Sequence, residues 1–373
     1  MWCLEVLGWP GNGGLRYRLD SKKRVEVMDE KLLARVSNAR GVSGFEDEIQ
    51  ALVTDVLDDC CDETRQDPMG NVIGLKRATS VPEGALRPLR VMVSAHADEV
   101  GMMVKHITAD GYIKFQPLGG LRGSTISAQQ VLIYGRELVR GVVVPTENLD
   151  SQLPSLDEMY IDVGRTADEV RQVVEIGDPI TFVREFERLN DKVFTGRNFD
   201  DRIGTYCLLE AMRGLGDTQV DVYAVSSVQE EMGVRGAWPA AYAIEPDIGI
   251  AVDGSVTRGP YNLVGHGDPT CEMGKGAGVY VMDGHTIGNP RLVRFLLDLG
   301  ASHSIPTQRN IGGGTDAEAI QRAKAGAMAT TVGAPVRYMH STVQLCHQDD
   351  IDATVSLIRT FLEHAHELMV IDK

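Results

Sequence analysis

Two adjacent glutamates at the end of an apolar run are the first candidates for chemistry. In the stretch VYAVSSVQEEMGVRGA, residues 222–237, the run VYAVSSV has the composition of a buried strand, and Glu230 and Glu231 follow it closely. Burying two like charges side by side costs several kcal/mol unless a positive group lies beside them. We therefore expect a cation next to Glu230 and Glu231.

The same arrangement recurs after two other apolar runs. His96 and Asp98 follow VMVSA, and Asp253 follows IGIAV. In an open α/β sheet, ligands bind beyond the carboxyl ends of the strands. Three predicted strands therefore deliver carboxylates and an imidazole to one edge of the sheet.

Two further segments supply polar residues to the same chemistry. Asp200 and Asp201 open a predicted helix, and His340 follows the run AMATTV in a loop. A carboxylate at a helix start is usually an N-cap, and either aspartate can have that role. Imidazole and carboxylate ligands together suit zinc, cobalt or manganese. Two histidines and three carboxylates suffice for two ions if one carboxylate bridges them, which leaves one of the adjacent glutamates free to move protons.

The elements that must position these residues form an α/β domain with an insertion. Strands alternate with amphipathic helices over residues 28–101 and 183–373, which predicts a mostly parallel central sheet covered on both faces. Residues 102–182 are instead short apolar runs separated by Gly, Pro and Asn, which predicts a small β domain. Residues 1–27 are expected to be an N-terminal extension of this two-part molecule.

Composition excludes several classes of partner. The net charge is −16 and no run of Lys and Arg is available to neutralise phosphates, so we expect no nucleic-acid partner. No apolar stretch reaches the length of a membrane span, so we expect no membrane partner. The six cysteines include no C-x-x-C pair, and we expect free thiols in the cytoplasm.

Three alternative functions compete with that of a metal hydrolase. The loop GGGTDAE lacks the Lys and Ser/Thr spacing of a P-loop, and we expect Gly313, Gly314, Thr315 and Asp316 to bring backbone close to a substrate instead. A glycosidase that pairs Glu230 with Asp253 leaves the two histidines and Asp200 without a role. A non-catalytic oligomeric scaffold leaves the free glutamate without a purpose.

Six motifs in order, from about Met28 to the C-terminus, resemble those of one family. SAHADEVG, NFDDRIG, QEEMGVRGA, AVDG, GGGTDAEAI and RYMHS are similar to the motifs of dinuclear metallo-aminopeptidases of the glutamyl aminopeptidase and tetrahedral (TET) type. The resemblance implies a zinc-peptidase α/β sandwich with an inserted PDZ-like β domain used for oligomerisation. It also implies dimers that assemble into a dodecamer.

The resemblance assigns the metal ligands residue by residue. It implies that His96 and Asp253 complete one metal site, that Glu231 and His340 complete the other, and that Asp200 bridges both ions. The cofactor is then two divalent ions per subunit, zinc or cobalt, with manganese as a further possibility.

The resemblance also implies the catalytic roles. Glu230 is expected to be the general base, Asp98 to orient the His96 imidazole, and the Asp200–Asp201 peptide bond to be cis. The predicted reaction is the release of N-terminal residues from peptides with a free N-terminus, by a water molecule that two metals activate.

Overall fold

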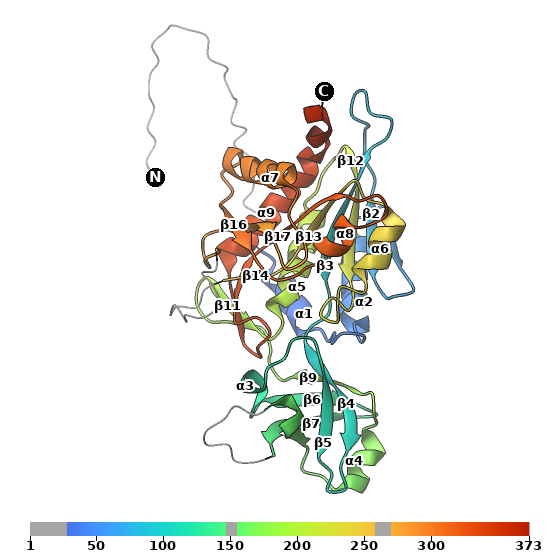
Figure 1. The fold of residues 1–373 in the computed structure, drawn as a ribbon, viewed down its shortest axis with the longest axis vertical. Helices are drawn as coiled ribbons and strands as arrows, with labels where there is room; N and C mark the ends of the chain where they lie inside the picture. Colours follow the sequence, from blue (N-terminus) through green and yellow to red (C-terminus); the bar gives the residue numbers. More distant parts are fainter. Residues whose placement is uncertain (1–27, 147–154, 258–269, 373) are drawn as a thin grey trace.

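The computed structural model describes residues 28–146, 155–257 and 270–372, and they form an α/β body with a barrel at one end (Figure 1). The extension predicted for residues 1–27 lies outside the described residues. In the described part, no helix combines the length and apolarity that crossing a membrane requires.

An eight-stranded mixed sheet forms the centre of the α/β body. In spatial order its strands are β1 (Glu63–Gln66), β2 (Val72–Lys76), β12 (Val220–Ser227), β3 (Leu89–His96), β13 (Ile248–Val252), β17 (Met328–Gly333), β15 (Ala277–Met282) and β16 (Thr307–Ile311). The four strands β12, β3, β13 and β17 run parallel, and antiparallel pairings connect them to β2 on one side and to β15 on the other. The predicted α/β fold is confirmed, and the sheet that was predicted to be mostly parallel is mixed, with its parallel strands at the centre.

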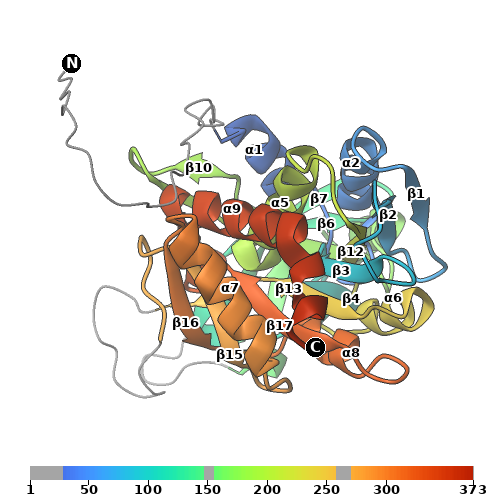
Figure 2. The same ribbon diagram turned by 90° about the horizontal axis from the view of Figure 1, so that it is seen from above.

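Helices cover both faces of this sheet because its central strands are apolar on both sides. Along β3, Val91 and Val93 face one helical layer and Met92 faces the other, as the two-residue period of a strand requires. Figure 2 shows the two layers from above. The larger layer consists of α1 (Glu30–Asn38), α2 (Asp47–Asp58), α5 (Phe199–Arg213), α7 (Pro290–Ser302) and α9 (Gln348–His364), which the 3-10 helix η2 (Ala365–Asp372) follows. The smaller layer consists of α6 (Ala237–Ile244) and α8 (Ala317–Gln321).

A second, five-stranded sheet lies beside the first. Its order is β10 (Glu187–Arg188), β11 (Val193–Gly196), β19 (Gln344–His347), β18 (Pro335–Arg337) and β14 (Ser255–Val256). The sequence pattern does not separate this sheet from the first. It matters for function because the loop after β18 carries His340 and the segment after β11 carries Asp200.

The inserted β domain is a closed six-stranded barrel. Its strands, in order around the barrel, are β4 (Gly101–Ile107), β5 (Ile113–Leu118), β8 (Met159–Asp162), β7 (Leu138–Pro145), β6 (Gln130–Tyr134) and β9 (Pro179–Phe182). Three short helices accompany them: α3 (Gly123–Ile126), η1 (Leu156–Glu158) and α4 (Ala167–Val173). The interior is a separate apolar core. The likeness to a PDZ domain stays a prediction.

The chain passes between the α/β body and the barrel through a two-stranded stem. The entering strand β4 and the leaving strand β9 pair with each other, with Met102 opposite Ile180. The chain therefore leaves the body just after His96 and returns after Phe182, ahead of β10, β11 and Asp200.

Candidate metal centre

Three neighbouring parallel strands bring the candidate residues together. His96 is the last residue of β3, Asp253 follows β13 directly, and Glu230 lies three residues beyond β12. Because β12, β3 and β13 are adjacent and parallel, their carboxyl ends meet at one edge. The predicted convergence at this edge is therefore present.

A buried carboxylate orients the His96 imidazole. His96 Nδ1 lies 3.3 Å from Asp98 Oδ1 and 3.1 Å from the Asp98 carbonyl oxygen, which leaves Nε2 directed at other groups. Asp98 is itself fixed, because it accepts hydrogen bonds from the Ser43 hydroxyl at 2.6 Å and from the Glu230 and Glu231 amides at 2.9 and 3.2 Å. Burial alone raises the pKa of Asp98, but these partners and His96 hold it below its ordinary value. Asp98 thus ties the loop after β12 to the imidazole at the end of β3.

Asp200 lies between the two candidate imidazoles. Its Oδ1 is 3.3 Å from His96 Nε2 and its Oδ2 is 3.2 Å from His340 Nε2. The backbone of Asp200 and Asp201 departs from helical angles at the start of α5, and the peptide bond between them is cis, as predicted. Burial raises the pKa of the Asp200 carboxyl, but the two imidazoles more than offset this and lower it. One carboxylate therefore faces both histidines, the arrangement that a bridging ligand needs.

Glu231 and His340 form the other side of the centre. Glu231 Oε1 lies 3.4 Å from His340 Nε2, yet outside hydrogen-bonding geometry, and this buried oxygen has no hydrogen-bond partner among the described residues. Burial lowers the pKa of His340, but Asp200 and Glu231 raise it to about 11. A buried carboxylate oxygen without a donor, facing an imidazole nitrogen, fits a position where a cation binds.

Glu230 and Asp253 concentrate more negative charge at the same point. Glu230 Oε2 lies 3.8 Å from His96 Nε2. Burial raises the pKa of Glu230 well above its ordinary value; His96 opposes this, and Asp253 and Glu231 add to it. Burial, with its neighbours Asp201 and Asp200, raises the pKa of Asp253 in the same way. Carboxylates are crowded here beyond what the two imidazoles neutralise, so the donor set fits divalent cations.

Two ligand groups satisfy the spacing that a metal ion needs. One group is His96, Asp201 and Asp253, and the other is His96, Asp200 and Glu231; the ligand atoms of each group lie within 4.8 Å of one another. The sequence pattern did not place Asp201 at the centre. Both oxygens of Asp201 accept backbone hydrogen bonds, from His96 N at 3.2 Å and from Gly204 N at 2.9 Å. Of the two aspartates, Asp201 therefore has the cap-like role and Asp200 faces the imidazoles.

A cavity of about 550 Å³ opens over this centre. Glu230, Glu231, Asp253 and His340 lie in its wall, and so do Gly313, Gly314 and Thr315 of the glycine-rich loop. Asp316 lies elsewhere: it is buried and accepts hydrogen bonds from the hydroxyls of Ser94 and Ser227, at 2.6 and 2.5 Å. Gly313, Gly314 and Thr315 therefore line the cavity, whereas the aspartate of the loop points into the sheet.

The cavity wall also contains residues that the sequence did not single out. Arg122 comes from the barrel, and Tyr338 and Met339 come from the loop before His340. Tyr338 and Met339 belong to the RYMHS motif, and their position beside His340 could have predicted that they line the cavity. Arg122 lies in the insertion, and nothing in its local sequence connects it to the metal ligands.

The comparisons with known proteins find similarity to aminopeptidases. The family model described as M42 glutamyl aminopeptidase matches residues 70–357. The lysyl aminopeptidase of Pyrococcus furiosus is 35% identical over 351 residues, which cover 90% of this chain and 97% of that protein.

Two solved structures are similar over nearly their whole length. The aminopeptidase APDkam598 from the archaeon Desulfurococcus kamchatkensis superposes with a TM-score of 0.86 at 31% identity, covering 92% of this chain and 97% of that one. The TET1 peptidase of Pyrococcus horikoshii, described as able to assemble into a tetrahedron or a large octahedral shell, gives a TM-score of 0.78 at 27% identity and covers 89% and 98% of the two chains.

Proposed function

This chain belongs to the M42 glutamyl aminopeptidase family, and from that premise we propose that it is a two-metal aminopeptidase. The observation that carries the proposal is the position of Asp200, whose two oxygens face His96 and His340 at 3.3 and 3.2 Å. A protonated imidazole on each side is a costly arrangement for a buried site, whereas two neutral imidazoles and a bridging carboxylate are a common dinuclear ligand set.

The proposed ligand assignment uses five residues. His96 and Asp253 would hold one divalent ion, Glu231 and His340 would hold the other, and Asp200, which faces both histidines, would serve both sites. Zinc or cobalt, with manganese as a third choice, suits this mixture of nitrogen and oxygen donors. When bound, the two ions supply the Lewis acidity that activates a water molecule and polarises the scissile carbonyl.

The chain's own residues position the substrate and move the proton. Glu230, in the cavity wall, accepts a proton from the attacking water and passes it to the leaving amine. Asp98 supports the chemistry indirectly, because its contact with His96 Nδ1 keeps Nε2 directed at the centre. The backbone of Gly313 and Gly314 forms the part of the wall that an extended peptide can approach closely.

The substrates are peptides with a free N-terminus. The names of related proteins include both a lysyl and a glutamyl aminopeptidase, so the preferred N-terminal residue differs within this group of proteins. A panel of aminoacyl chromogenic substrates, assayed with Zn²⁺, Co²⁺ and Mn²⁺ and again after chelation, tests the activity. Chelator-sensitive hydrolysis of aminoacyl substrates is expected. Chelator-resistant hydrolysis of a glycoside substrate would favour the glycosidase alternative instead.

We also propose that the barrel mediates assembly in the cytoplasm. The TET1 peptidase is described as able to assemble into a tetrahedron or a large octahedral shell, and closed homo-oligomers are common among soluble enzymes. The five described cysteines are free thiols, which suits a reducing compartment. A dodecamer built from dimers is expected in light scattering. A fully active monomer at dilute concentration would contradict this assembly without affecting the metal chemistry.

A further inference from the structure

A glycine turn of the barrel touches the metal centre of the same subunit. Gly119 and Gly120 follow β5 directly. A Cβ atom placed on Gly120 would lie 2.6 Å from His340 Nδ1 and 3.0 Å from its Cε1, and one on Gly119 would lie 3.1 Å from Glu231 Oε2. The bare backbone of this turn therefore packs against both residues that we assign to the second ion.

We propose that the Gly119–Gly120 turn is a positioning element that fixes His340 and Glu231 for the second metal ion. This inference rests on the proposed two-metal function and gives the barrel a part in the active site besides assembly. His340 needs such a support, because its imidazole is 38% exposed toward the cavity, whereas that of His96 is only 2% exposed and is fixed by Asp98. The turn closes the side of the His340 ring opposite to Asp200, since Nδ1 faces Gly120 and Nε2 faces the carboxylates.

Local contacts hold the turn against the loop after β12, which carries Glu231. The Gly119 amide lies 3.3 Å from the sulfur of Met232, the residue that follows Glu231. A Cβ on Gly119 would also lie 2.7 Å from a methyl group of Val100, at the entrance of the stem. The turn is thus packed between the loop that carries Glu231 and the start of the barrel.

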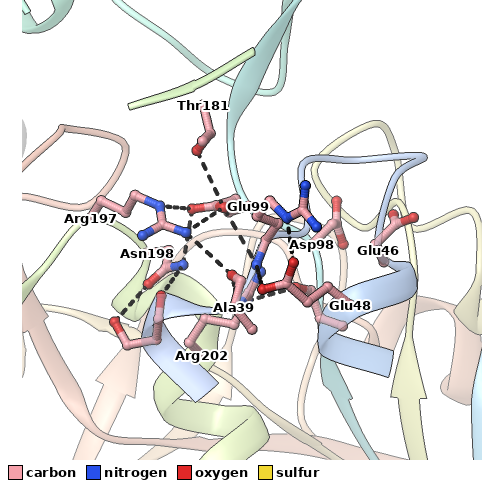
Figure 3. A network of polar contacts seen from close by, with 12 residues as sticks. Ala39, Glu46, Glu48, Asp98, Glu99, Thr181, Arg197, Asn198 and Arg202 are labelled. Atoms are coloured by element: carbon pink, nitrogen blue, oxygen red, sulfur yellow. Dashed lines mark hydrogen bonds and ion pairs between the residues drawn. The ribbon is translucent and has the colours of Figure 1, made fainter. Parts of the chain in front are cut away.

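A buried network at the stem fixes the barrel as a whole (Figure 3). Glu99, which directly follows Asp98, accepts hydrogen bonds from Arg197 at 2.8 and 3.1 Å and from Asn198 at 2.9 Å. The Thr181 hydroxyl of β9 also reaches Glu99, at 3.4 Å. One carboxylate therefore connects both ends of the stem to the segment that leads into Asp200.

Gly120→Ala is the most selective probe of the turn. The backbone of Gly120 is not left-handed, so an alanine there introduces only a methyl group, whereas Gly119 has a φ of +83° and would add backbone strain. The methyl group collides with the end of a partly exposed side chain rather than with backbone. The imidazole can therefore swing into the cavity and relieve the clash without disturbing the core.

The test titrates the metal-free protein with Co²⁺, following the visible absorption of the ion and the heat of binding. The second ion should bind about 10–100-fold more weakly to Gly120→Ala, the range for altered support of a metal ligand, and the first ion should bind as in the wild type. Gly216→Ala is the matched control, since no atom of the described residues lies within 4 Å of a Cβ at that exposed glycine. It should bind both ions normally.

The outcomes distinguish a positioning role from a general role in folding. Normal affinity for both ions in Gly120→Ala would overturn the inference. Equal weakening of both ions, or a lower melting temperature of the metal-free variant, would assign the glycine to the fold and overturn it as well. A wild-type protein that binds fewer than two ions would contradict the proposed function instead.

Discussion

Removing the arginine of the stem network should destabilise the protein strongly. Arg197 and Glu99 form a buried ion pair whose side chains are 6% and 2% exposed. Arg197 also donates to the carbonyl oxygens of Arg184 at 2.9 Å and Ala39 at 3.2 Å. In Arg197→Ala these carbonyl groups lose a donor, and the Glu99 carboxylate stays buried without its principal charge partner.

The expected loss follows from that burial. Breaking a buried pair by removing one partner costs about 3–5 kcal/mol, because an uncompensated charge remains. Two features of the site keep the loss within this range: Asn198 still donates to Glu99, and the guanidinium of Arg202 lies 3.9 Å away. Arg197→Lys should lower the free energy of unfolding less than Arg197→Ala does, since lysine keeps the positive charge although it cannot form the two parallel hydrogen bonds.

Urea denaturation of the metal-free protein measures this effect, with the exposed pair of Arg77 and Glu63 as an internal control. Those side chains are 57% and 61% exposed, so solvent screens their attraction, and Arg77→Ala should lower the free energy of unfolding far less than Arg197→Ala does. A loss below about 1 kcal/mol in Arg197→Ala, comparable to Arg77→Ala, would refute the reasoning that the stem depends on a buried charge.

Two further predictions concern pH and the bridging ligand. Burial, with a contribution from Asp98, raises the pKa of Glu46 from its ordinary value of 4.5 to about 7. Protonated Glu46 therefore adds to the free energy of unfolding of the metal-free protein below pH 4.5. This added stability is lost as the pH rises through 7. In urea denaturation, the wild-type free energy of unfolding should fall by about 3 kcal/mol more than that of Glu46→Gln as the pH rises through this range. Equal pH dependence of the free energy of unfolding in variant and wild type would contradict the assignment. Asp200→Ala should lose both ions in metal analysis, whereas Asp253→Ala should retain the ion held by Glu231 and His340; normal binding of two ions by Asp200→Ala would show that the bridge is wrongly assigned.

The residues at the sheet edge could be predicted from the sequence because the carboxyl ends of parallel strands lie at the same edge. His96, Glu230 and Asp253 follow separate apolar runs, and a parallel arrangement of those runs suffices to bring their carboxyl ends together. The cis bond at Asp200 and the orienting contact of Asp98 came from the family resemblance, and the structure contains both.

What the sequence did not predict depends on contacts between distant segments. The Gly119–Gly120 turn and Arg122 reach the centre only because the stem sets the position of the barrel, and no periodicity carries that information. Asp316 was expected near the substrate, yet its place at the start of α8 directs it toward two serines of the sheet. The ion pair of Glu99 and Arg197 likewise could not be predicted from the sequence, because the two residues lie 98 positions apart.

The most direct test of a two-metal centre with a glutamate base is Glu230→Gln, assayed together with its metal content. This variant keeps the shape of residue 230 and all five proposed ligands but removes the group that accepts the proton. We expect two ions per chain, as in the wild type, and a turnover number lower by about 10²–10⁴-fold on the best aminoacyl substrate. Near-normal turnover in the metal-loaded variant would contradict the base assignment, and loss of an ion would show that Glu230 is a ligand instead.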